Sequence, residues 1–157
     1  GFSTDSDQRC TCTAWQRDKY YRRLSGPLLD RMDLCLEVPK IKTEELLSLD
    51  PAESSEQIRA RVQAARDRQA RRTHLTGVLT NAELRSEHLR TLLTLTPDAR
   101  TILTCAIERY HLSGRAFART LKVAQTIADL AQEDTILAAH IAEALLYRRL
   151  PGTGQKD

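Results

Sequence analysis

The sequence predicts a mainly α-helical protein, in which a helical bundle follows a short remnant of a different architecture. Aromatic residues make up only 4% of the 157 residues, so the core must be packed from aliphatic side chains, which favours helices over a sandwich or barrel. From residue 54 onward, apolar residues recur at helical spacing between recognisable caps. One short segment, residues 34–38, has the apolar, proline-bounded pattern of a buried strand.

Caps and apolar stripes place the helices. A helix over residues 13–24 begins at Thr13 and carries a basic face with interleaved aromatic residues. That face suits either a nucleic-acid contact or a solvated helix packed beside a larger core. Further helices are predicted to begin at Ser54, Ser86, Thr96 and Ser113, and the last one to cover residues 135–149. Short connections between them predict a compact antiparallel bundle.

We divide the chain into a remnant over residues 1–40, a connector over 41–53, a helical domain over 54–150 and a disordered polar tail over 151–157. A single strand cannot stand alone, because its edges need pairing. The chain offers no second good strand. We therefore expect that this is a piece of a longer protein that holds the partner strands, or that the strand segment is rearranged.

Composition limits the remaining choices. The net charge of +3 is too small to predict a partner by itself. Cysteines at positions 10, 12, 35 and 105 make no convincing disulfide framework, and no signal peptide or membrane-spanning run is found. We expect a cytoplasmic protein without a membrane partner.

Two arginines, Arg31 and Arg115, are singled out by their local sequence. Arg31 follows a glycine–proline turn and lies between two carboxylates, Asp30 and Asp33. From the residues alone, Arg31 suits a local salt bridge to those carboxylates. Arg115 lies in the first turn of a predicted helix, where unpaired N–H groups favour anions. The alternative interpretation is that the Arg115 side chain is only solvated.

The helix that begins at Ser54 carries six arginines within fourteen residues, the densest basic surface of the chain. It suits a contact to a nucleic-acid backbone, an inter-subunit salt-bridge surface or a solvated face, and loss of binding at high salt would identify the first. The candidate nucleic-acid residues are Arg59, Arg66, Arg68 and Arg71.

Residues 25–34 (SGPLLDRMDL), residues 112–130 and the Cys10-Thr11-Cys12 element resemble the Mg-chelatase branch of the AAA+ ATPases, most closely the ComM/YifB type. The resemblance implies that residues 1–40 end an αβα ATPase core and that the helical domain is its lid. It makes Arg31 the arginine finger and Arg115 the sensor-2 arginine. Cys10 and Cys12 match half of a four-cysteine element that suits a structural zinc site. The family usually has arginine at the position of Gln125, so a contact from there is in doubt.

Full-length relatives of this kind form hexameric rings that bind ATP and Mg²⁺, and the ComM type unwinds DNA to promote branch migration during transformation. This chain lacks the G-x-x-x-x-G-K-[ST] phosphate loop. Alone it is expected to be an inactive monomer without cofactor. Two alternatives stay open: the ATPase subunit of a true magnesium chelatase, and a non-enzymatic helical module that binds nucleic acid.

Overall fold

A computed structural model describes residues 10–23, 26–36, 38, 41, 43, 47 and 52–148. Within them the chain is helical, as predicted, and contains no sheet. The elements are α1 (Ala14–Tyr21), α2 (Gly26–Leu29), α4 (Ser55–Arg71), α5 (Thr73–Thr76), η1 (Asn81–Glu83), α6 (Ser86–Thr91), α7 (Pro97–Tyr110), α8 (Gly114–Leu130) and α9 (Ala138–Leu146). The predicted disordered tail, residues 151–157, lies outside the described residues.

The predicted caps at Thr13, Ser54, Thr96 and Ser113 are confirmed. Each of these hydroxyls accepts a hydrogen bond from the backbone N–H three residues later, which satisfies one of the unpaired donors at a helix start. Ser54 and Gln57 form the predicted capping box, because the Gln57 side chain accepts from the Ser54 N–H (3.0 Å). In α6, by contrast, Ser86 is the first helical residue and Arg85 is the cap.

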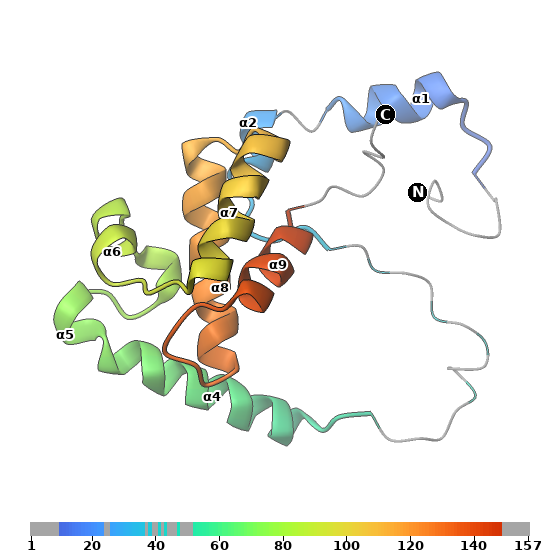
Figure 1. The fold of residues 1–157 in the computed structure, drawn as a ribbon. Helices are drawn as coiled ribbons and strands as arrows, with labels where there is room; N and C mark the ends of the chain where they lie inside the picture. Colours follow the sequence, from blue (N-terminus) through green and yellow to red (C-terminus); the bar gives the residue numbers. More distant parts are fainter. Residues whose placement is uncertain are drawn as a thin grey trace.

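Helix α8 is the centre of the bundle. It packs against α4, α6, α9 and η1, while α7 packs against α9 (Figure 1). The small side chains of α8 allow this close approach on several sides, and Ala116, Ala124 and Ala128 are among the least exposed residues. The central core consists of Leu84, Leu89, Ala99, Leu103, Leu121, Ala124, Ala128, Ile136, Ile141 and Ala144.

The predicted strand over residues 34–38 is not formed in the part of the chain that is described. Residues 34–36 and 38 are irregular, and Leu36 and Val38 are exposed. No second strand is present among the described residues to pair with them, and an unpaired strand is not stable. Instead, the Cys35 N–H donates to the carbonyl of Tyr147, just after α9 (2.7 Å).

The last helix begins later than predicted. Ile136 forms an isolated parallel bridge with Leu95, and its N–H donates to the carbonyl of Thr94 (2.8 Å). This pairing buries Ile136 completely but holds its backbone outside the helix, so α9 starts at Ala138. None of the described helices is long and apolar enough to cross a membrane.

Candidate functional site

Arg31 lies in a turn that directly follows α2. The N–H groups of Arg31 and Met32 donate to the carbonyls of Leu28 and Leu29, each at 3.0 Å, so the helix closes into a turn rather than continuing. Pro27 sits in the first turn of α2, where its missing N–H costs nothing. The short apolar segment is therefore present, but Gly26 and Pro27 belong to α2 instead of the predicted turn, and the turn of the described residues comes at Asp30 and Arg31, with Arg31 on the surface.

Side-chain contacts hold this segment against the start of α8. The Ser113 hydroxyl, which caps α8, donates to Asp30 Oδ2 (2.8 Å), and Arg119 forms an ion pair with Asp33. Arg148, just after α9, donates from Nη1 to the Met32 carbonyl (2.8 Å). In Figure 1, α2 accordingly lies beside the end of the bundle where α8 begins.

Arg31 and Arg115 share one property. Both are exposed, and neither guanidinium has a hydrogen bond or ion pair in the part of the chain that is described. The carboxylates on either side of Arg31 bind other residues. The alternative interpretation of Arg31, a local salt bridge to Asp30 or Asp33, is therefore not what the structure shows. Because Asp30 binds Ser113, the structure brings the Arg31 turn and the first turn of α8 together.

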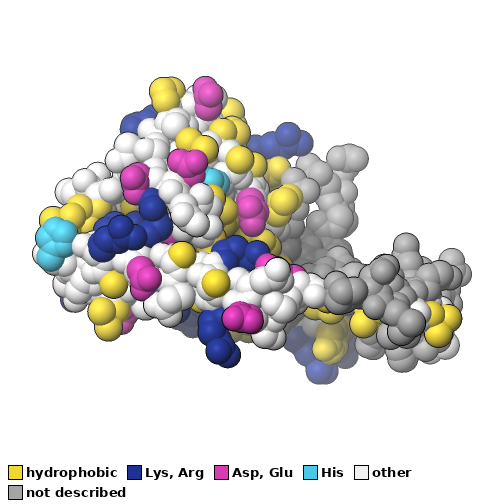
Figure 2. Space-filling view, turned by 90° about the horizontal axis from the view of Figure 1, so that it is seen from below, with side chains coloured by type: hydrophobic (Ala, Val, Ile, Leu, Met, Phe, Trp, Pro, Cys, Tyr) yellow, Lys and Arg dark blue, Asp and Glu magenta, His cyan; other side chains and the backbone are white. Residues whose placement is uncertain are grey.

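The six arginines of α4 and its C-cap, Arg72, differ in their partners: Arg61 pairs with Glu53 (2.7 Å), and the other five form two sets, of which the first is exposed. Arg59 has no partner among the described residues, Arg66 donates to the side chain of Gln69 (3.1 Å), and Arg71 donates to the carbonyl of Asp67 (3.4 Å). Figure 2 looks toward α4 and shows dark blue basic side chains separated by magenta acidic ones, not one continuous basic patch. The contact of this surface with nucleic acid stays a prediction.

The second set, Arg68 and Arg72, lies against a carboxylate that is 0% exposed, Asp129 of α8. Arg72 donates to both Asp129 oxygens, at 2.8 and 2.6 Å, a bidentate geometry that strengthens charge-assisted hydrogen bonds. Arg68 is less well placed, with Nε 4.0 Å from Asp129 Oδ1 and an ion pair to Asp134. Arg68 was predicted as a nucleic-acid residue, and its charge is offset here by carboxylates.

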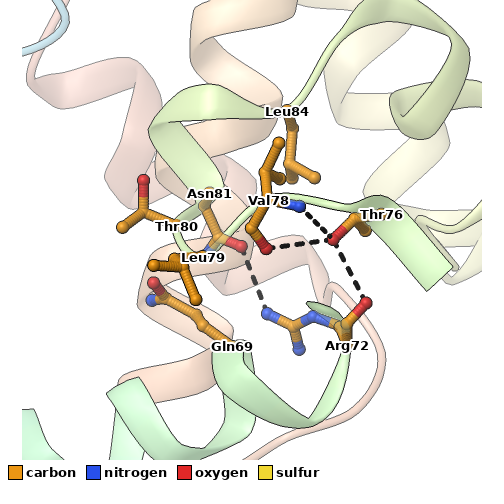
Figure 3. A pocket seen from close by; sticks show the side chains of 8 residues that line it. All are labelled: Gln69, Arg72, Thr76, Val78, Leu79, Thr80, Asn81 and Leu84. Atoms are coloured by element: carbon orange, nitrogen blue, oxygen red, sulfur yellow. Dashed lines mark hydrogen bonds between the residues drawn. The ribbon is translucent and has the colours of Figure 1, made fainter. Parts of the chain in front are cut away.

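Two amides complete this buried group. Asn81 donates to Asp129 Oδ2 (2.8 Å) and accepts from Arg72 (3.2 Å), and Gln125 donates to Asp129 Oδ1 (3.2 Å). Figure 3 shows Arg72 and Asn81 pointing toward each other in a small pocket. This pocket is lined by neither the Arg31 turn nor the start of α8. Gln125 thus has a structural partner at the position where the resemblance placed arginine.

Sequence reasoning missed this network. Its members are far apart along the chain, since Arg72 and Asp129 are separated by 57 positions. One signal was present: Asp129 is the acidic residue on the buried face of α8, which also includes Ala124 and Ala128. A buried acid is almost always paired with a cation and hydrogen-bonded.

The cysteine element lies apart from these arginines. Cys10 is half-buried and Cys12 exposed, both as free thiols. The pKa of the Cys10 thiol lies below its ordinary value, first because of a hydrogen bond from the Cys12 backbone, and further because of the nearby Arg17, while burial opposes the shift. A low pKa favours the thiolate, the form that binds metals. No group of three or more potential ligands occurs among the described residues. The two cysteines correspond to two of the four thiolates of a structural zinc site, which stays a prediction.

Comparison with known proteins assigns the chain to a family. The profile described as magnesium chelatase, subunit ChlI C-terminal, matches residues 52–148. The chain belongs to the magnesium chelatase family. A second profile of this magnesium chelatase family, described as subunit ChlI, matches residues 1–46.

Individual relatives refine the assignment within the magnesium chelatase family. The chain is 42% identical to the uncharacterized protein YifB of Escherichia coli (strain K12) over 141 residues, which are 88% of this chain and 27% of YifB. It is 40% identical to the competence protein ComM of Haemophilus influenzae over 139 residues, 88% of this chain and 26% of ComM. An uncharacterized protein of Mycobacterium tuberculosis is 37% identical over 142 residues, 90% of this chain and 28% of that protein. These matches confirm the Mg-chelatase-like ComM/YifB type. The chain spans about a quarter of the length of these relatives.

Proposed function

We propose that this chain is the C-terminal part of a hexameric Mg-chelatase-like AAA+ ATPase, in which Arg31 is the arginine finger and Arg115 the sensor-2 arginine. The observation that carries the proposal is that both guanidiniums are exposed and without partners in the described part of the chain. Nearby Arg119 and Arg148 both have carboxylate partners. Unpaired arginines that remain beside paired ones are available to an anion from outside.

The chemistry of a nucleoside triphosphate suits this arrangement. A guanidinium is planar and permanently charged, and it stabilises the charge that develops on the transferring phosphoryl oxygens. Arg115 lies in the first turn of the 17-residue α8, where the helix dipole also favours an anion. Because the Asp30–Ser113 hydrogen bond joins the Arg31 turn to this helix start, both arginines belong to one region of the surface. That placement supports joint contacts to the same ATP, held by the neighbouring subunit.

The proposed activity is that of a ComM-type DNA helicase promoting branch migration. The relative named competence protein ComM supports a connection with competence. ATP and Mg²⁺ would be bound by parts of the full-length protein that this chain does not contain, since it has no phosphate loop. The exposed arginines Arg59, Arg66 and Arg71 are the residues of α4 that we propose for DNA contact.

Substitution of the two arginines in the full-length protein tests the proposal. We expect Arg31→Ala to lower kcat by about 10³–10⁵-fold, the range for an arginine finger, with ATP binding nearly unchanged. Arg115→Ala should weaken ATP binding as well. Steady-state ATPase assays and fluorescent-nucleotide titration measure both effects.

A mixing experiment tests whether Arg31 acts on a neighbour. Arg31→Ala subunits mixed with subunits that carry a phosphate-loop substitution should regain activity, because each supplies what the other lacks. Absence of any recovery would show that Arg31 does not act between subunits.

The description of the matching family favours a second candidate, the ATPase subunit of a magnesium chelatase. Stimulation of the full-length ATPase by branched or single-stranded DNA supports the helicase. Stimulation only by chelatase partner subunits supports the chelatase. Nucleotide-independent DNA binding by residues 54–150 alone, with a steep salt dependence, would instead favour a non-enzymatic nucleic-acid module.

A further inference from the structure

The two carboxylates nearest to Arg31 in the chain are both bound by residues from the end of the bundle. Asp30 accepts from the Ser113 hydroxyl through Oδ2 (2.8 Å), and its Oδ1 lies 3.6 Å from Arg148 Nη2. Asp33 forms its ion pair with Arg119. Each carboxylate beside Arg31 is therefore already engaged by a group from outside the turn.

Without those partners, Asp30 and Asp33 would be the anions closest to Arg31. They precede and follow it by one and two residues, and residues 30, 31 and 33 form a turn and bend rather than a helix. The side chains are therefore not fixed on opposite faces of a helix, as neighbours in a helix would be. A long arginine side chain in such a turn can reach either carboxylate, and the resulting pair would compete with a phosphate for the guanidinium.

We propose that Ser113, Arg119 and Arg148 are positioning residues that hold Asp30 and Asp33 away from Arg31 and so keep its guanidinium available. The inference rests on the proposed function, in which Arg31 contacts ATP. Arg119 gives the clearest test of this proposal, because it is the ion-pair partner of Asp33 and has no other partner among the described residues.

The proposal predicts an unequal effect of two substitutions that break the same ion pair. In the full-length ATPase, Arg119→Gln releases a charged Asp33 that can pair with Arg31, and we expect kcat to fall about three- to fivefold, the strength of an exposed ion pair. KM for ATP should stay the same. Asp33→Asn breaks the same pair but leaves no competing charge, so kcat should fall by about twofold or less.

The double variant distinguishes two explanations: pairing of the released Asp33 with Arg31, and structural support of the turn by the Arg119–Asp33 ion pair. We expect Arg119→Gln with Asp33→Asn to have the activity of Asp33→Asn alone, because the competing carboxylate is gone. Equal losses in both single variants and the double variant would mean that the ion pair only supports the turn, and would overturn the proposal. Arg85→Gln is the matched control, since it removes an exposed arginine with a carboxylate 3.9 Å away in another part of the bundle, beside α6.

A direct measurement separates this inference from the proposed function. Phenylglyoxal modifies unpaired guanidiniums faster than paired ones, because a carboxylate favours the protonated form. Peptide mass spectrometry should show slower modification of Arg31 in Arg119→Gln and recovery in the double variant, with exposed Arg59 as the internal reference. An unchanged rate in Arg119→Gln would overturn the inference. If Arg31→Ala retained full ATPase activity, the proposed function would fail, while the labelling would still show whether Arg119 prevents pairing of Arg31.

Discussion

Two pairs of arginines in this chain differ in how their charges are balanced. Arg68 and Arg72, near the end of α4, lie against the buried carboxylate of Asp129. Arg31 and Arg115 are exposed and have no partner in the described part of the chain. The first pair contributes to the fold, whereas the second is available to an external anion. The comparison shows that an arginine's role follows from its partners, which a count of arginines along the sequence does not give.

The largest effect on stability is expected when the paired arginine with the better geometry is removed. Arg72→Met leaves Asp129, which is 0% exposed, without its bidentate partner, and should lower the free energy of unfolding by about 3–5 kcal/mol. Asp129→Asn should cost less, about 2 kcal/mol, because Arg72 is 27% exposed and can turn toward water. Urea unfolding of the chain, followed by circular dichroism, measures both.

The double variant is the control for this pair. Arg72→Met with Asp129→Asn should be more stable than Arg72→Met alone, because no charge is left buried without a partner. If the double variant were as unstable as the sum of the single ones, the cost would come from packing and not from an unpaired carboxylate.

Arg68 should behave differently from Arg72, although both lie beside Asp129. Its Nε is 4.0 Å from Asp129 Oδ1 and lacks a hydrogen-bond partner, and its other ion-pair partner, Asp134, is 96% exposed. We expect Arg68→Met to lower the free energy of unfolding by about 1 kcal/mol or less. A loss as large as that of Arg72→Met would show that Arg68 supports Asp129 equally.

The sequence could predict features that depend on neighbouring residues, but not those that depend on contacts between distant ones. Helix starts at Ser54, Thr96 and Ser113 were predicted correctly, because a cap depends on residues only three positions apart. The segment at residues 34–38 forms no strand in its described residues, which fits the stated alternative of a rearranged segment, and the start of the last helix was wrong. A strand depends on a distant partner, and this helix start depends on the pairing of Ile136 with Leu95.

The candidate site divides in the same way. The motif around Arg31 and the helix start before Arg115 are local patterns and could be found in the sequence. Which arginines have partners could not, because Asp129 reaches α4 only through the packing of α8. The ion pair between Asp33 and Arg119 likewise joins residues 86 positions apart.

The smallest effects on stability are expected for the two unpaired arginines, Arg31 and Arg115. Their substitution tests whether they differ from Arg68 and Arg72 in having no structural partner. Arg31→Gln should change the free energy of unfolding by less than about 0.5 kcal/mol, since an exposed side chain without partners contributes little to stability. Arg115→Gln should stabilise the chain slightly, by about 0.3–1 kcal/mol, because a cation in the first turn of α8 opposes the helix dipole. Urea unfolding beside Arg72→Met gives the reference scale. A loss above about 1 kcal/mol for either variant would assign that arginine a structural partner, and availability to an external anion would no longer distinguish it from Arg68 and Arg72.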